Sequence, residues 1–202
     1  MSLFEKNRLY LEELFPRLGP EIFEKYNPTD ELHITRNSKG IVSAQLDGRW
    51  VHSKLNPFRE AERLINKTTQ QHSASAIFLG FGLGYQIEVF FQRFPQGEAL
   101  IIEKSPELFL KALTARDFTG VLTEKTSLLI GLEVSDLQAA LSSLVLRNHL
   151  IIPLHPVTQT APDYYESVTK LIAAEQSRKK VNSTTVKRFG KRWVRNLAEN
   201  LD

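Results

Sequence analysis

Residues 74–94, ASAIFLGFGLGYQIEVFFQRF, decide the fold class. An apolar run is followed at once by Gly80-Phe81-Gly82-Leu83-Gly84 and then by a helical pattern of apolar positions. Glycines between a strand and a helix permit a tight turn and let the backbone approach a ligand at the helix N-terminus. The order of strand, glycine turn and helix predicts the start of a Rossmann-like unit.

The next apolar run, EALIIE, ends at Glu103, 19 residues after Gly84. A Rossmann-type site places an acid there to bind a pair of ribose hydroxyls. The spacing GxGxG is closer to the S-adenosylmethionine-binding turn of methyltransferases than to the dinucleotide pattern GxGxxG. The candidate ligand-binding residues are Gly80, Gly82, Gly84, Tyr85 and Glu103. A second interpretation stays open, in which the glycines only allow close packing of strand and helix.

The rest of the chain extends this pattern in both directions. After the glycine unit, SPELFLKALTAR and VSDLQAALSSLVLR are helical patterns, and GVLTE, SLLIG and HLIIPL are short apolar pieces between and after them. Alternation of apolar strands with helices indicates a parallel α/β sheet covered on both faces. Before the unit we expect helices at 3–15 and 21–26, and a meander of strands at 31–36, 40–46 and 49–53. A helix at 57–67 follows, with Asn56 as N-cap and Pro57 at its first position.

These patterns predict an α/β protein in three parts. Residues 1–70 form a small helical and antiparallel β-meander subdomain, and residues 71–160 form a Rossmann-like domain with a mostly parallel sheet. The polar stretch 68–75 is the expected linker between them. Residues 161–202 hold C-terminal helices at 162–180 and 184–201, which lead toward a downstream domain.

Composition excludes several kinds of chemistry. The 202 residues include no cysteine, so disulfides, thiolate metal sites and cysteine nucleophiles are ruled out. The five histidines show no metal-binding spacing, and no GxSxG or GxxxxGK[ST] motif occurs. His155 follows a predicted strand, and we interpret it as a loop residue. The sequence requires no cofactor, although a nucleotide or S-adenosylmethionine would suit the glycine turn.

The net charge of +3 is unevenly distributed along the chain. Residues 176–202 carry eight basic and two acidic side chains, whereas residues 1–175 carry 18 basic and 21 acidic ones. The basic tail also has an apolar stripe at helical spacing that includes Phe189 and Trp193. We interpret this stripe as a packed face, and we do not expect nucleic acid as its partner. No apolar run is long enough to cross a membrane, and no signal peptide is present, so we expect a cytoplasmic protein.

The segment 50–63, WVHSKLNPFREAER, places His52, Ser53 and Glu60 between a predicted strand and a predicted helix. Together with GFGLGY, IIE and FGKRWVRNLAENL, it resembles the motility accessory factor (Maf) family over residues 50–201. Maf proteins are bacterial flagellin glycosyltransferases and relatives, some of which act as pterin diphosphokinases. His52, Ser53 and Glu60 are family-motif positions, and no catalytic residue can be transferred from the family.

The resemblance implies transfer of a nonulosonic acid from its CMP-activated form to Ser or Thr of flagellin. It also implies that the transferase site lies in a central domain, whose glycine–proline–serine signature is missing here. We therefore expect this chain to be the N-terminal domain of a longer protein, with that downstream domain and flagellin as partners and no catalysis by itself. Two alternatives remain: a methyltransferase that uses the glycine turn and Glu103, and a non-enzymatic docking module.

Overall fold

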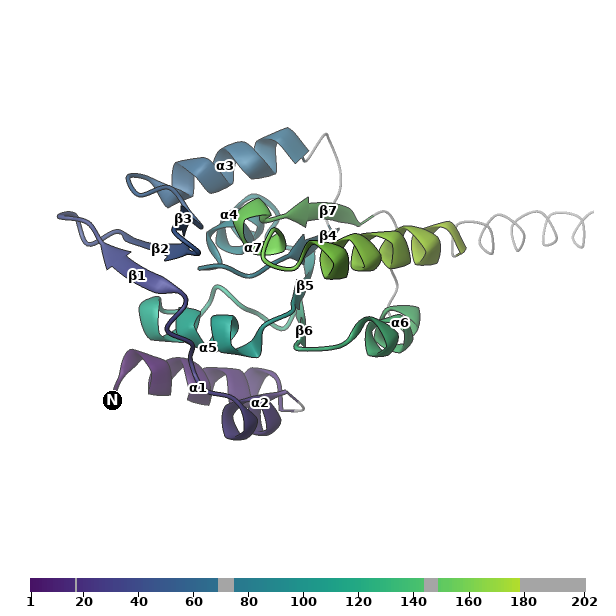
Figure 1. The fold of residues 1–202 in the computed structure, drawn as a ribbon, viewed down its shortest axis with the longest axis horizontal. Helices are drawn as coiled ribbons and strands as arrows, with labels where there is room; N and C mark the ends of the chain where they lie inside the picture. The colour runs from purple at the N-terminus through teal and green to yellow at the C-terminus, as the bar shows by residue number, and fades with distance from the viewer. Residues whose placement is uncertain (17, 69–74, 144–148, 179–202) are drawn as a thin grey trace, which may run out of the picture.

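The computed structural model describes residues 1–16, 18–68, 75–143 and 149–178 (Figure 1). The first part of the chain contains two helices, a small sheet and a third helix. In chain order these are α1 (Leu3–Leu14), α2 (Gly19–Lys25), β1 (His33–Arg36), β2 (Val42–Leu46), β3 (Arg49–Trp50) and α3 (Pro57–Thr68). The three strands pair antiparallel in the order β1-β2-β3, which confirms the predicted meander.

The second part alternates strands with helices. Its elements are β4 (Ser75–Leu79), α4 (Tyr85–Arg93), β5 (Glu98–Glu103), α5 (Pro106–Ala115), β6 (Thr126–Ile130), α6 (Val134–Ser143), β7 (Leu150–Pro153) and α7 (His155–Thr158). A further helix covers residues 162–178. The four strands form one parallel sheet in the order β6-β5-β4-β7. The predicted Rossmann-like architecture is therefore confirmed.

Alternation along the central strands divides the interior into two cores. On one face, Phe78 and Ile101 pack with α4, α5 and the N-terminal elements, including β2 and α3. On the other face, Ile77 and Ile102 pack against α6 and the helix at 162–178. Successive strand residues point to opposite faces, so a buried sheet must be apolar at every position. Residues from both sides of position 70 share the first core.

Local capping signals set the helix boundaries that the sequence predicts. Asn56 accepts a hydrogen bond from the Arg59 N–H at 2.9 Å, which confirms it as the cap of α3. Ser105 accepts from the Leu108 N–H at 3.1 Å and caps α5, whose first residue is Pro106. Such caps supply partners for N–H groups that the helix itself leaves unpaired.

A buried asparagine fastens the first helix to the Rossmann-like part. The side-chain amide of Asn7 donates to the carbonyls of Leu113 and Arg116 at the end of α5, at 2.8 and 2.7 Å. Its oxygen accepts from the Phe118 N–H at 2.9 Å. The Lys6 ammonium adds an exposed ion pair with Asp117, and this pairing lowers the pKa of that carboxyl to about 2. Asn7 thus closes the C-terminal end of α5 and fixes where α1 lies.

Two expected strands differ from the structure. The strand predicted at 49–53 ends at Trp50, because Val51 and His52 turn inward and are buried. The piece GVLTE at 120–124 forms no strand and makes only an isolated bridge between Thr119 and Leu122. Backbone groups of this piece bond to Tyr10 instead: the Tyr10 hydroxyl donates to the Leu122 carbonyl and accepts from the Gly120 N–H.

Other expectations fall on the remaining segments. His155 is exposed, as expected of a loop residue, but it begins the short helix α7. The helix predicted at 162–180 is present as far as residue 178. Most of the predicted linker and the whole of the helix predicted at 184–201 lie outside the described residues. Among the described residues, no helix combines the length and the apolar character that crossing a bilayer requires.

The role of Asn7 predicts a large effect of a small substitution. Asn7→Ala removes three hydrogen bonds and leaves buried carbonyl and N–H groups unpaired, each at a cost of about 1–3 kcal/mol. We expect a loss of about 3 kcal/mol or more in the free energy of unfolding by urea. Glu13→Ala, at an exposed position of the same helix, is the control and should change it by less than about 0.5 kcal/mol. A loss no larger than the control's would contradict the role of Asn7.

Candidate functional site

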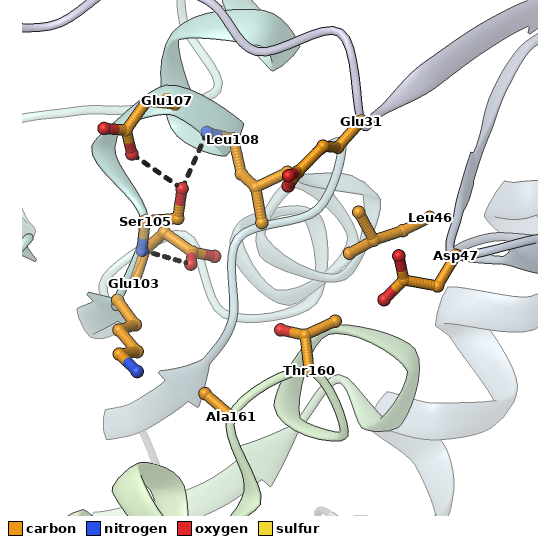
Figure 2. A pocket seen from close by; sticks show the side chains of 10 residues that line it. Glu31, Leu46, Asp47, Glu103, Ser105, Glu107, Leu108, Thr160 and Ala161 are labelled. Atoms are coloured by element: carbon orange, nitrogen blue, oxygen red, sulfur yellow. Dashed lines mark hydrogen bonds between the residues drawn. The ribbon is translucent and has the colours of Figure 1, made fainter.

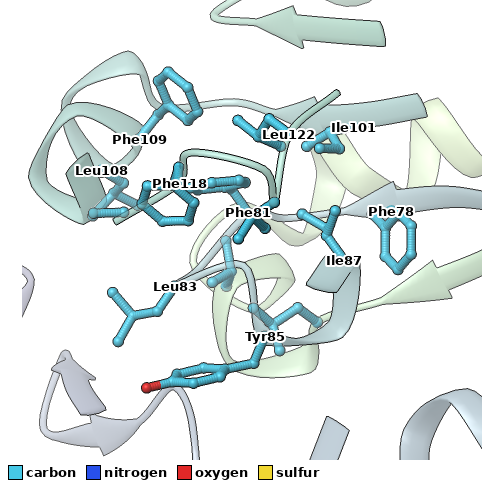
Figure 3. Close-up of a cluster of buried hydrophobic side chains, with 14 of the residues drawn as sticks. Phe78, Phe81, Leu83, Tyr85, Ile87, Ile101, Leu108, Phe109, Phe118 and Leu122 are labelled. Atoms are coloured by element: carbon cyan, nitrogen blue, oxygen red, sulfur yellow. The ribbon is translucent and has the colours of Figure 1, made fainter. Parts of the chain in front are cut away.

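The glycine turn connects β4 to α4 at the carboxyl edge of the parallel sheet. Gly80, Gly82 and Gly84 have φ of 88°, 54° and 72°, a region that side chains with a Cβ rarely adopt. All residues from 80 to 86 are buried, and Phe81 and Leu83 are fully so. Phe81 and Phe118 lie side by side in the buried cluster (Figure 3), and their ring centroids are 5.1 Å apart. The turn therefore lies inside the protein.

Side chains of this chain occupy the space that each glycine leaves open. A Cβ on Gly80 would meet Val157 at 2.9 Å, and one on Gly84 would meet Phe118 at 2.8 Å. A Cβ on Gly82 would meet Leu154 Cδ2 at 2.5 Å and His52 Nε2 at 2.7 Å. In a nucleotide-binding turn the ligand makes this close approach. Here Leu154 and Val157 at α7, His52 after β3 and Phe118 after α5 make it.

The N–H groups of the turn also bond within the chain. The Phe81 N–H donates to Glu103 Oε2, and the Leu83 N–H donates to His52 Nε2, both at 2.9 Å. These are the donors that would otherwise bind the anionic part of a ligand. Glu103 and His52, predicted respectively as a ligand-binding and a family-motif residue, are thus brought together on the two sides of one turn.

His52 is 3% exposed and accepts a hydrogen bond through Nε2, so its ring proton is assigned to Nδ1. Nδ1 lies 4.0 Å from Glu60 Oε2, and the same carboxylate oxygen accepts from the Ser53 N–H at 2.7 Å. Burial first, and the nearby Arg116 charge second, lower the pKa of His52 to about 3. The three family-motif positions therefore form one connected group around a neutral imidazole.

Arg116, at the end of α5, also contacts the turn. Its guanidinium donates to the Leu83 carbonyl and pairs with the Glu88 carboxylate. It also lies 3.7 Å from the centroid of the Tyr85 ring, a cation–π geometry. The Tyr85 hydroxyl donates to the Val42 carbonyl at 2.6 Å, and burial raises the pKa of that hydroxyl. Tyr85 thus links α4 to the meander, and nothing in its bonding calls for a ligand.

Glu103 is 1% exposed and has three donors within the chain. Besides Phe81, the Ser105 N–H donates to Oε1 at 3.0 Å and the Tyr165 hydroxyl donates to the same oxygen at 3.2 Å. Burial raises the pKa of this carboxyl, and the backbone N–H bonds oppose that shift. The carboxylate therefore holds the turn, the start of α5 and the helix at 162–178 together.

A pocket of about 430 Å³ opens beside Glu103 at the same edge of the sheet (Figure 2). Asp47 and Glu31 face it from the N-terminal part, and Thr160 and Ala161 border it after α7. The residues that line it supply four carboxylates and one ammonium group, on Lys104. This charge balance disfavours the phosphates of a nucleotide and would tolerate a neutral or cationic molecule.

Sequence reasoning missed three contributors to this region. Arg116, Tyr165 and Gln86 reach the turn or its acid from helix ends and from a distant helix. Gln86 is buried and donates to the Phe81 carbonyl at 3.0 Å, while its Oε1 has no partner. Position 86 carried a weak signal, because Gln86 is a polar residue within two positions of the last glycine of the turn. Arg116 and Tyr165 carried none, since only the fold brings them near.

Metal binding finds no support in this region. Across residues 1–16, 18–68, 75–143 and 149–178, no three His, Asp or Glu side chains gather as a metal ion would require. The histidine at the turn uses Nε2 for a backbone N–H, so that nitrogen is not available as a ligand.

The packing around Gly82 predicts a position-dependent cost of adding one methyl group. Gly82→Ala should lose about 2–5 kcal/mol, from the strain of a positive φ and from overpacking against Leu154 and His52. Gly48→Ala is the matched control, because Gly48 has a φ of 72° and nothing within 4 Å of the added Cβ. Urea unfolding measures both. Equal losses in the free energy of unfolding for the two variants would contradict tight packing around Gly82.

The low pKa of His52 predicts a pH-dependent stability. An unfolded histidine takes up a proton near pH 6.5, whereas His52 in the fold stays neutral down to about 3. Stability from this group is full above pH 6.5 and falls by about 1.4 kcal/mol per pH unit below it. His52→Gln keeps an acceptor for the Leu83 N–H and removes this group's pH dependence. The difference in free energy of unfolding between wild type and the variant should therefore become smaller from pH 7 to pH 5. His33→Gln, on the exposed edge of β1, is the control. A gap that stays constant would contradict a buried neutral His52.

Comparison with known proteins shows what this chain is similar to. Residues 43–129 match the family model described as the glycosyltransferase Maf N-terminal domain. An uncharacterized protein of Treponema pallidum (strain Nichols) is 28% identical over 213 residues, which cover 98% of this chain and 71% of the relative.

The solved structure of a Maf glycosyltransferase from Magnetospirillum magneticum AMB-1 has the same fold. It matches 86% of this chain with a TM-score of 0.59 and 14% identity. The match covers 35% of that protein, so this chain spans about a third of its length. The resemblance to the N-terminal region of the motility accessory factor family is therefore confirmed over residues 43–129, which match the Maf N-terminal domain.

Proposed function

We propose that this chain is the supporting N-terminal domain of a Maf-type glycosyltransferase and does not catalyse transfer alone. The observation that carries the proposal is the match of residues 43–129 to the Maf N-terminal domain. The reaction we assign to the whole protein is transfer of a nonulosonic acid from its CMP-activated form to Ser or Thr of flagellin, in the cytoplasm. The transferase groups would come from a further domain.

The geometry of the glycine turn supports a role without nucleotide binding. His52 and Glu103 already occupy its N–H donors, and Leu154 and Val157 fill the space beside its glycines. The neighbouring pocket is acidic and would repel a phosphodiester. The turn therefore has the sequence of a ligand-binding site, but its N–H groups and its glycines contact side chains of the same chain. These contacts argue against the methyltransferase alternative.

The proposal is tested in a bacterium that carries the gene. Deletion should remove the nonulosonic acid from flagellin peptides, as read by mass spectrometry, and the wild-type gene should restore it. Because Gly82→Ala disturbs the packing of the glycine turn against Leu154 and His52, that variant should restore less glycosylation than the matched Gly48→Ala variant. Unchanged flagellin masses after deletion would refute the assignment.

A second measurement separates support from catalysis. In calorimetric titrations of this chain, we expect no binding of CMP or of S-adenosylhomocysteine at micromolar concentrations. Micromolar binding of S-adenosylhomocysteine would overturn the proposal in favour of a methyltransferase. Micromolar binding of CMP would show that the domain itself contributes to the nucleotide site.

A further inference from the structure

One corner of the molecule combines exposed apolar side chains with positive charges. It is formed by the turn between β1 and β2 and by the loop that leads into α3. Leu55 is 76% exposed and Phe58 is 38% exposed, which makes them two of the few large apolar side chains at the surface of the described residues. We call this surface the basic corner, and its members are Arg36, Lys39, Lys54, Leu55, Phe58 and Arg59.

Hydrogen bonds hold the two segments of the basic corner side by side. Asn37 Nδ2 donates to the Lys54 carbonyl at 3.4 Å, which fastens the β1–β2 turn to the loop before α3. Arg36 donates to the Ala115 carbonyl at 2.9 Å, next to Arg116, whose guanidinium lies 5.7 Å from the Phe58 ring. The two segments are 17 positions apart at the Asn37–Lys54 bond, and the fold places them next to each other.

The apolar members are not needed to complete the core. The Phe58 ring packs edge-on against Tyr85, with centroids 4.9 Å apart, and leaves its outer side in solvent. Leu55 stands directly before the cap residue Asn56, at a loop position where a polar side chain would serve the fold equally well. A single exposed leucine is ordinary. Two exposed apolar residues three positions apart, Leu55 and Phe58, with Lys54 and Arg59 beside them in the sequence, are typical of an interaction surface.

The charges of the basic corner are available to a partner. In the described part of the chain, the side chains of Lys39, Lys54 and Arg59 form no ion pair, and Lys54 lies over the Trp50 ring at 5.7 Å. The nearest acid along the chain, Glu60, accepts from the Ser53 N–H and faces His52. The corner is therefore positive although residues 1–175 as a whole are acidic.

We propose that the basic corner docks an acidic polypeptide segment that presents an apolar side chain between its carboxylates. Charge complementarity selects the acidic partner, and Leu55 with Phe58 supplies the apolar contact. A nucleic acid would need open aromatic faces for stacking, whereas Phe58 lies against Tyr85 and Trp50 lies under Lys54. A membrane surface would need a larger apolar face than Leu55 and the partly exposed Phe58 provide. This docking role goes beyond the proposed transferase support and does not depend on it.

The experiment measures binding of a fluorescent synthetic peptide of glutamates with interspersed leucine and phenylalanine to this chain by anisotropy. Lys54→Glu with Arg59→Glu should weaken binding about tenfold or more, and Leu55→Ser about fivefold. The matched controls are Arg63→Glu with Lys67→Glu, farther along α3, and Leu9→Ser, which is 48% exposed on α1. The controls should change binding less than twofold, and thermal melts verify that every variant folds.

Three results would overturn the inference. One is a lack of binding to the acidic peptide, and another is binding that the basic-corner variants and the controls weaken equally. The third is binding of phosphatidylglycerol vesicles or a single-stranded oligonucleotide in place of the peptide, with the same dependence on Lys54 and Leu55. Since the readout is binding and not glycosylation, failure here leaves the transferase proposal standing, and the reverse holds as well.

Discussion

The pairing of the backbone N–H and carbonyl of Leu83 is the constraint on which the arrangement of this domain depends. The N–H donates to His52 and the carbonyl accepts from Arg116, two side chains that come from different segments of the chain. A buried peptide group without partners costs about 1–3 kcal/mol for each unpaired atom. The glycine turn, the segment after β3 and the end of α5 are therefore tied together at Leu83. This requirement joins the meander and the parallel sheet into one unit, as their shared core also shows.

The same constraint changes the meaning of a familiar motif. Glycines between a parallel strand and a helix usually bring the backbone close to a cofactor. Here Gly80, Gly82 and Gly84 bring it close to Val157, His52 and Phe118. The family motif around His52 and Glu60 is then best understood as the counterpart of the glycine motif, since one segment fills the space that the other leaves. Architecture alone does not imply a ligand.

Local patterns in the sequence were enough for most of the fold. Periodicity predicted the parallel strands and their helices, and the residue types at Asn56 and Pro57 marked the start of α3. The strand at 49–53 was predicted too long, because the inward turn of His52 is set by the Leu83 N–H, 31 positions away. No local signal reports a partner at that distance. Ligand binding at the turn stays a prediction, because the glycine spacing is compatible both with a ligand and with the contacts to Val157, His52 and Phe118.

His52 competes, from within the chain, with any free molecule for the Leu83 N–H of the glycine turn. A group tethered by a short connection is present at an effective concentration in the millimolar range or above, without having to diffuse to its site. A free molecule that sought the Leu83 N–H would have to compete with that concentration and also expel Leu154 from beside Gly82. Small molecules selected against this domain should therefore bind elsewhere on its surface, although its sequence carries the motif that usually guides such a search.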